Sequence, residues 1–146
     1  LVFKSPWIGL IGSIPVVLAL FWDFGVIRAF GWSLDAMNMM VSALAIGIGV
    51  DFTIHMTHRF QEEWKSNGNS PREAISISIQ SVGRAITAAA ATTIGVFAVL
   101  SLSRMPPVTR FGQLAALVIF FALVSALVVL PAVLLAYAEW KEKRES

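Results

Sequence analysis

The feature that most constrains this chain is a series of four apolar segments, each long enough to cross a lipid bilayer as a helix. A transmembrane helix needs about 20 mostly apolar residues. Such segments cover approximately residues 7–29, 35–58, 82–103 and 111–137. Of the 146 residues, 57% are hydrophobic and 14% are charged, whereas soluble domains average about 45–50% apolar and about 25% charged residues. The sequence therefore predicts an all-α, polytopic membrane protein with four transmembrane helices.

The connectors between these segments contain signals for helix starts and helix ends. In the long connector after the second segment, Ser70 precedes Pro71, and Glu73 follows in the first turn. This is the pattern of a capping box with proline at the first helical position. We expect a short helix over residues 71–80 that lies in the membrane interface. A Pro-Pro pair at residues 106–107 separates the third and fourth spans.

Basic residues are distributed unevenly between the two sides of the predicted bundle. One side holds Lys4, Arg59, Lys65, Arg72, Arg84, Lys141, Lys143 and Arg144, and the other holds Arg28, Arg104 and Arg110. The side of a membrane protein that is richer in Lys and Arg faces the cytoplasm. We therefore expect a multi-pass protein of the inner (plasma) membrane with both termini in the cytoplasm.

One acidic residue, Asp51, lies within the apolar second span. A carboxylate at bilayer depth costs about 2.5–3.5 kcal/mol on insertion scales, and intramembrane acids usually have a function. We expect Asp51 to face the bundle interior or a wet cavity, where removal from water favours its protonated form. A carboxyl group of this kind can bind and release protons, so Asp51 is the first candidate for a proton relay.

Helical periodicity places two histidines on the face of Asp51, His55 one turn further and His58 two turns further towards the cytoplasm. An acid followed by imidazoles could conduct protons to the inner surface. The alternative is that both histidines interact with the helix dipole at its cytoplasmic end. For His58 the alternative is favoured, whereas for His55 both roles remain open, and we include His55 in the predicted relay.

Small residues in the second and third spans predict close contacts between helices. Gly47 and Gly49 lie in the second span, and Ala88 and Gly95 lie in the third. Glycine and alanine let transmembrane helices approach one another. The neighbouring Thr92 and Thr93 are further candidates for the proton relay, although threonine hydroxyls in membrane helices also bond their own backbone.

A second acid, Asp23, lies near the outer end of the first span. We expect it to be solvated, or to reach the membrane surface and pair with Arg28.

Several functional classes are excluded. No nucleophile–base pair, metal-ligand cluster or phosphate-binding glycine loop stands out, so we predict no enzyme, no metal site and no cofactor. A net charge of +2 is too small to suggest nucleic acid as a partner, and the absence of cysteine excludes disulfides.

The order of these motifs resembles a known family. Residues 47–60, which include the run Gly-Ile-Gly-Val-Asp-Phe-Thr-Ile-His, resemble the fourth or tenth helix of the resistance–nodulation–division (RND) superfamily. The closest branch is the MmpL-like and hopanoid-exporter-like group, which is related to the sterol-sensing domain of Patched-type proteins. Residues 82–95 resemble the helix that comes next, and residues 103–112 and 130–132 resemble the last helix of a repeat.

The resemblance implies an architecture of twelve helices in two six-helix repeats, each repeat with a large extracytoplasmic domain after its first helix. Residues 1–146 would be part of such a transmembrane domain, either helices nine to twelve, which the basic tail favours slightly, or helices three to six. The family uses the proton-motive force through acids on two central helices, a role that maps onto Asp51. Many members have tyrosine after this acid, whereas this chain has Phe52, which puts an Asp–Tyr pair from this half in doubt.

The expected function is proton-driven export of lipidic or hydrophobic substrates. The expected partners are the lipid bilayer, such a substrate, and the remaining helices and extracytoplasmic domains of the same transporter; a homo-oligomer is left open. One alternative is a sterol-sensing-type module that binds lipid and regulates partners. Another is a Sec-associated RND subunit that assists protein export, which residues 52–55 fit poorly.

Overall fold

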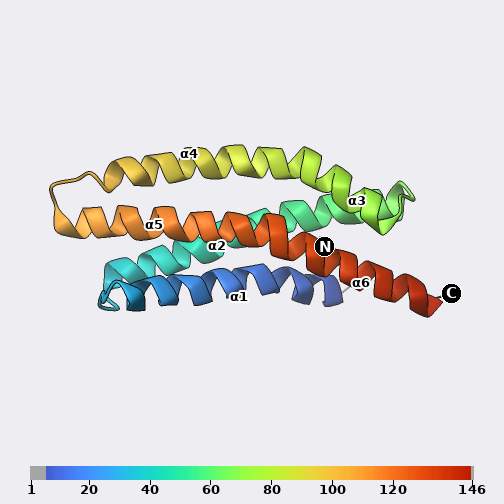
Figure 1. The fold of residues 1–146 in the computed structure, drawn as a ribbon, viewed down its shortest axis with the longest axis horizontal. Helices are drawn as coiled ribbons and strands as arrows, with labels where there is room; N and C mark the ends of the chain where they lie inside the picture. The colour runs from blue at the N-terminus through green and yellow to red at the C-terminus, as the bar shows by residue number, and fades with distance from the viewer. Residues whose placement is uncertain (1–5, 146) are drawn as a thin grey trace.

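The computed structural model describes residues 6–145, and this part of the chain consists of helices joined by short connectors, with no strand. Successive helices run into one another through π-helical turns and form four long rods (Figure 1). The elements are α1 (Pro6–Ala29), α2 (Ala36–Gln61), η1 (Glu62–Ser66), α3 (Pro71–Ser78), η2 (Ile79–Gly83), α4 (Arg84–Leu100), α5 (Pro106–Val124), η3 (Ser125–Val129) and α6 (Leu130–Glu145). Each rod is long and apolar enough to cross a membrane. The predicted all-α fold with four spans is confirmed.

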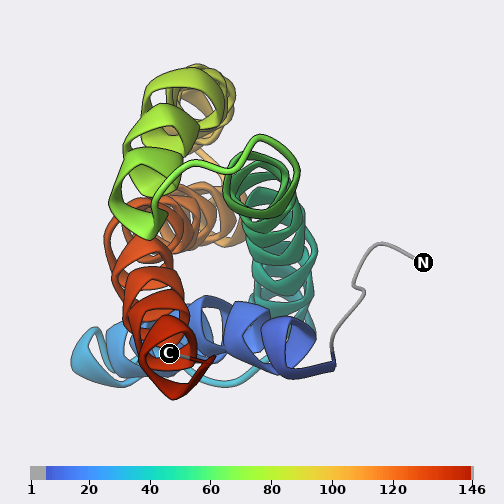
Figure 2. The same ribbon diagram turned by 90° about the vertical axis from the view of Figure 1, so that its right-hand side faces the viewer.

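The four rods run alternately up and down, so both ends of the described chain lie at the same end of the bundle (Figure 1). We call this the basic end, because Arg59, Lys65, Arg72 and Lys141 lie there. Lys4, which also contributed to the predicted orientation, lies outside the described residues. Viewed from this end, the rods surround a common axis (Figure 2). Helix α5 packs against α1, α2 and α4, whereas α4 packs mainly against α5.

The segment expected as a separate interfacial helix is the first part of the third rod. The capping box at its start is present: the Ser70 hydroxyl accepts from the backbone N–H of Glu73, and the Glu73 carboxylate accepts from the N–H of Ser70. After this start no proline interrupts the helix before residue 100, so α3 continues through η2 into α4. Ala74 and Ile75 of α3 are buried in a core cluster with Phe60 of α2.

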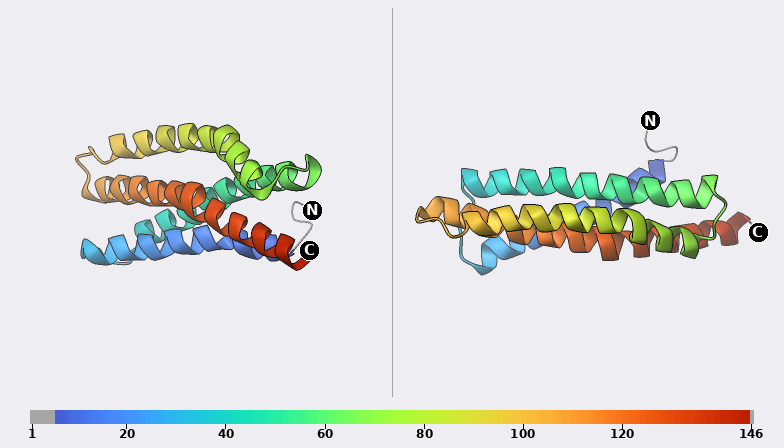
Figure 3. Two further views of the ribbon diagram at one scale, coloured as in Figure 1. Left: turned by 45° about the vertical axis from the view of Figure 1, so that its right-hand side comes forward. Right: turned by 90° about the horizontal axis from the view of Figure 1, so that it is seen from above.

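The third and fourth rods bend where the π-helical turns η2 and η3 lie (Figure 3). Figure 3 shows α3 and α6 turning away from the lines of α4 and α5. The bend between α5 and α6 follows from Pro131, whose ring cannot fit against the carbonyl group of Leu127 in a regular helix. The turn η3 includes Leu127, and π-helical turns are a common cause of bends.

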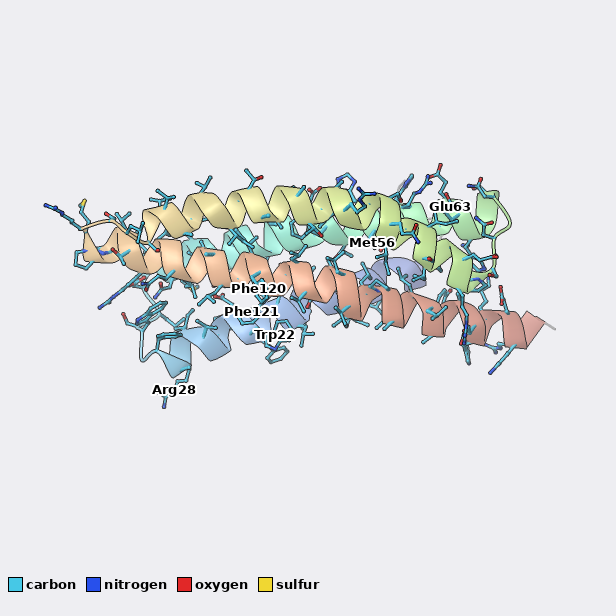
Figure 4. The ribbon with its side chains drawn as sticks, turned by 45° about the horizontal axis from the view of Figure 1, so that its top comes forward. Trp22, Arg28, Met56, Glu63, Phe120 and Phe121 are labelled. Carbon is cyan, nitrogen blue, oxygen red and sulfur yellow. The ribbon has the colours of Figure 1, made fainter. Side chains whose placement is uncertain are left out.

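The backbones of two rods approach closely where α4 ends and α5 begins. A Cβ atom added to Gly112 would lie 2.7 Å from the carbonyl oxygen of Phe97 and 2.7 Å from the backbone nitrogen of Ser101. Only glycine allows this approach, and no pattern in the sequence predicted a close contact at this position. Further along the bundle, Trp22 of α1 packs against Phe121 of α5 with ring centroids 4.9 Å apart (Figure 4).

Candidate functional site

The predicted relay residues Asp51 and His55 lie in contact on α2. The Nε2 atom of His55 is 3.3 Å from the Oδ1 atom of Asp51, one turn earlier on the same helix. Both side chains are largely exposed within the four rods, Asp51 by 67% and His55 by 62%. The face that they share with His58 is therefore directed away from the core of this bundle.

Asp51 and His55 line an open groove between α2 and the third rod. The groove has a volume of about 540 Å³ and is also lined by Phe52, Arg59, Ser81, Val82, Ala85, Ile86 and Ala89. Near the basic end, α2 contacts the third rod through α3 and η2. Further along, α4 packs against α5 instead of α2, and this leaves the groove between α2 and α4 (Figure 2). Asp51 is thus not enclosed by these four rods, but lies at the edge of a wide groove whose other walls are mostly apolar.

The two threonines of the predicted relay lie outside this groove, whose lining on α4 ends at Ala89. The hydroxyl of Thr92 donates to the carbonyl oxygen of Ala88 at 3.0 Å, and that of Thr93 donates to Ala89 at 2.9 Å. Both hydroxyl hydrogens are therefore engaged by the backbone of α4 itself. The structure brings Asp51 and His55 together but not these threonines.

The residues predicted to allow close helix packing behave differently from one another. Gly49 is buried, and a Cβ atom there would be in ordinary contact with Val16 of α1 and Ala122 of α5. Gly47 and Gly95 are exposed, and a Cβ atom at either would meet nothing within 4 Å in the described chain. Ala88 is exposed as well and lines a shallow groove beside η2.

The expectation that Asp23 is solvated and paired with Arg28 is wrong. Asp23 is fully buried, and its Oδ2 atom is hydrogen-bonded to the hydroxyl of Ser42 on α2. Arg28 is exposed at the end of α1 and points away from the bundle (Figure 4). The spacing contains a signal for this burial, because Asp23 continues the series Val16, Ala19 and Ile27 on the buried face of α1.

Comparison with known proteins agrees with the resemblance seen in the sequence. The sequence model of the MMPL family matches residues 1–146. A protein of Methanocaldococcus jannaschii that is named only as a membrane protein is 32% identical over 132 residues, which are 90% of this chain and 34% of that protein. The mycolic acid-containing lipids exporter MmpL11 of Mycolicibacterium smegmatis is 28% identical, with 90% of this chain covering 15% of the exporter.

A third relative is named as a heme uptake protein, MmpL11 of Mycobacterium tuberculosis. It is 29% identical, and 88% of this chain covers 14% of that protein. The chain thus spans about a third or less of the length of the relatives it matches. No solved structure matches it. Because the family match extends over every residue, this chain belongs to the MMPL family.

Proposed function

We propose that this chain is part of the membrane domain of a transporter that uses the proton-motive force to export lipidic or hydrophobic substrates, with Asp51 as its proton-carrying group. The observation that carries the proposal is a carboxyl group in the middle of an apolar span, in contact with an imidazole and facing an open groove. Acidic residues at such positions in membrane proteins mark proton pathways, and histidine is a frequent member of them.

The exposed face around Asp51 is the surface on which the remaining helices of the transporter would pack. Two features support this assignment. The third rod is the least buried of the four, with 17% of its most apolar stretch buried against 33–44% in the others. A groove with an ionisable pair at its edge would also be costly to leave facing lipid tails, because each charged group would lie in hydrocarbon.

In the proposed mechanism, proton binding changes how α2 packs. Deprotonated Asp51 carries a charge that His55, when protonated, balances at 3.3 Å. When Asp51 is protonated and His55 is neutral, neither side chain carries a charge, so the groove can close over them; transfer of the proton from Asp51 to the neutral imidazole then restores the ion pair at 3.3 Å. Protonated His55 next releases that proton towards the basic end, which the distribution of Lys and Arg predicts to be cytoplasmic, and becomes neutral again. Thr92 and Thr93 remain predicted contributors, which would act through helices that pack on the outer face of α4.

We propose a hydrophobic substrate because the relative from Mycolicibacterium smegmatis is named as an exporter of mycolic acid-containing lipids. The inner membrane as location, the cytoplasmic position of both termini, and the extracytoplasmic domains as partners belong to the same proposal.

The test is Asp51→Asn in the full-length transporter. The amide keeps the size of the side chain but cannot carry the proton, so transport driven by an imposed proton gradient in membrane vesicles should be lost while expression is unchanged. Asp35→Asn is the matched control, because Asp35 is an exposed acid at the start of α2 and asparagine can replace it as N-cap. Transport by Asp51→Asn at the wild-type rate would contradict the proposal.

A sterol-sensing-type lipid-binding module is the second candidate. It is supported by an apolar pocket of about 200 Å³ between α1 and α2, lined by residues that include Gly12, Val16, Val50 and Thr53. This function requires that added lipid raises the melting temperature and that collapse of the proton gradient has no effect. Exporter activity requires the gradient, so an uncoupler separates the two candidates. If the chain were instead part of a Sec-associated subunit, loss of the protein would impair protein export.

A further inference from the structure

The structure contains a second acid within the spans, and unlike Asp51 it is completely enclosed. Asp23 of α1 has no exposed surface, and its Oδ1 atom has no hydrogen-bond partner among residues 6–145. Its Oδ2 atom is hydrogen-bonded to the hydroxyl of Ser42, which projects from α2. The surrounding end of the bundle is filled by apolar side chains from three helices, among them Ile27, Val41 and Leu114.

No positive charge balances Asp23 within the described residues. It forms none of the ion pairs found there. The charged groups nearest to it in each packed helix are Arg28 on α1, Asp35 at the start of α2 and Arg110 on α5, and all three are exposed. The next ionisable residue along α2 is Asp51, more than two turns beyond Ser42. An ionised carboxylate with one hydrogen bond and no cation is a strongly unfavourable arrangement away from water.

The hydrogen bonds of Ser42 give an independent argument about the proton. The Ser42 oxygen is bonded to Asp23 Oδ2 and also lies 3.2 Å from the backbone carbonyl oxygen of Asn38. A serine hydroxyl has a single hydrogen, and a carbonyl oxygen can only accept. Both contacts are satisfied when Asp23 supplies its own hydrogen, so that the carboxyl O–H donates to Ser42 and Ser42 donates to Asn38. An ionised Asp23 would compete with Asn38 for the one hydrogen of Ser42.

We infer that Asp23 is a second proton-binding site of the transporter, which holds its proton while α1 and α2 are packed together at this level. The inference rests on burial and hydrogen bonding around Asp23, and does not depend on the role proposed for Asp51. Loss of this proton requires water or a cation to reach the carboxylate, and the closed contact between α1 and α2 excludes both. The charge of Asp23 is thereby coupled to the separation of these two helices.

Infrared difference spectroscopy of the purified full-length protein at neutral pH tests the inference directly. The spectrum of the wild type minus that of Asp23→Asn should contain the C=O stretching band of a protonated carboxyl group. Asp35→Asn, which alters an exposed acid beside the same helix pair, should remove carboxylate bands instead. If the Asp23→Asn difference contains only the bands of an ionised carboxylate, the inference is overturned.

A second variant keeps the test decisive if Asp23→Asn does not fold. Ser42→Ala retains the acid and removes the one hydrogen-bond partner that Asp23 has in the described part of the chain. The C=O band should then move to higher frequency, as for a carboxyl group that no longer donates a hydrogen bond. A shift confined to carboxylate bands overturns the inference.

Thermal unfolding gives a readout of the coupling. A proton held only in the packed state is lost as the pH rises, so the melting temperature of the wild type should fall from neutral to alkaline pH more steeply than that of Asp23→Asn. Parallel curves for the two proteins would show that Asp23 does not change its charge on unfolding and would overturn the inference.

Discussion

The Nη2 atom of Arg59 lies 2.6 Å from the Oε1 atom of Glu63, one turn further along the same rod at the basic end of the bundle. Glu63 is buried, and its second oxygen accepts hydrogen bonds from the side chains of Asn67 at 3.0 Å and Asn69 at 2.7 Å. One carboxylate thus connects the second rod to the loop that leads into the third.

Replacement of Glu63 by alanine should destabilise the protein by about 1–3 kcal/mol, because two amide groups and one guanidinium group lose a buried acceptor. Glu62→Ala is the control. Its carboxylate also pairs with Arg59, at 2.9 Å, but its side chain is 46% exposed, so its loss should change stability by less than about 1 kcal/mol. Unfolding in detergent, followed by loss of helical circular dichroism, measures both. An equal loss of stability in the two variants would mean that Glu63 does not hold the loop in place.

Substitution of Gly112 by alanine should disrupt the contact between α4 and α5. The new methyl group would lie 2.7 Å from backbone atoms of Phe97 and Ser101, and backbone cannot move aside as a flexible side chain can. Overpacking of this kind typically costs about 1–3 kcal/mol. Gly95→Ala is the matched control, because the added group would lie more than 4 Å from every described atom outside the adjoining residues and backbone of its own helix. A melting temperature for Gly112→Ala equal to that of the control would refute the close contact.

The capping box at the start of α3 predicts a position-specific loss of stability. Ser70→Ala removes the oxygen that accepts from the N–H of Glu73 and should cost about 1 kcal/mol. Ser70→Asn keeps an acceptor at the N-cap and should recover most of that loss. The comparison is made by thermal unfolding of the three proteins under identical conditions. An asparagine variant as unstable as the alanine variant would show that the cap is not the cause.

The features that could be predicted from the sequence are those that local patterns determine. The four spans follow from the length of the apolar segments, and the start of α3 follows from Ser70, Pro71 and Glu73, whose backbone preferences act within one turn. The end of that helix was not predictable in the same way. Isoleucines alternating with serines predicted a short helix over residues 71–80. In the structure Ala74 and Ile75 pack against α2, and the helix continues through η2 into α4, while its place in the membrane interface stays a prediction.

The environment of each acid depended on contacts that hydropathy does not encode. Asp23 and Asp51 are the same residue type in similar apolar segments, yet one is fully buried and the other is 67% exposed within these rods. The pattern in the sequence that indicates burial of Asp23 is its helical spacing with the apolar residues of α1 that are buried. Gly47 and Gly95 were predicted to allow close helix packing, but neither has a neighbouring helix in the described chain. Small residues indicate where a helix can approach, but not which helix does so.

The contact between His55 and Asp51 allows the relay to be separated from a simple effect of the helix dipole. Both His55 and His58 are exposed near the basic end of α2, but only His55 contacts Asp51 and lines the groove. A residue that transfers protons contributes roughly a hundredfold or more to a rate, so His55→Gln should slow proton-driven transport by roughly tenfold or more, because water in the groove can replace part of its role. His58→Gln should transport at nearly the wild-type rate. If both variants instead lower stability equally and leave transport unchanged, the two imidazoles serve the end of the helix alone, and protons reach Asp51 by another route.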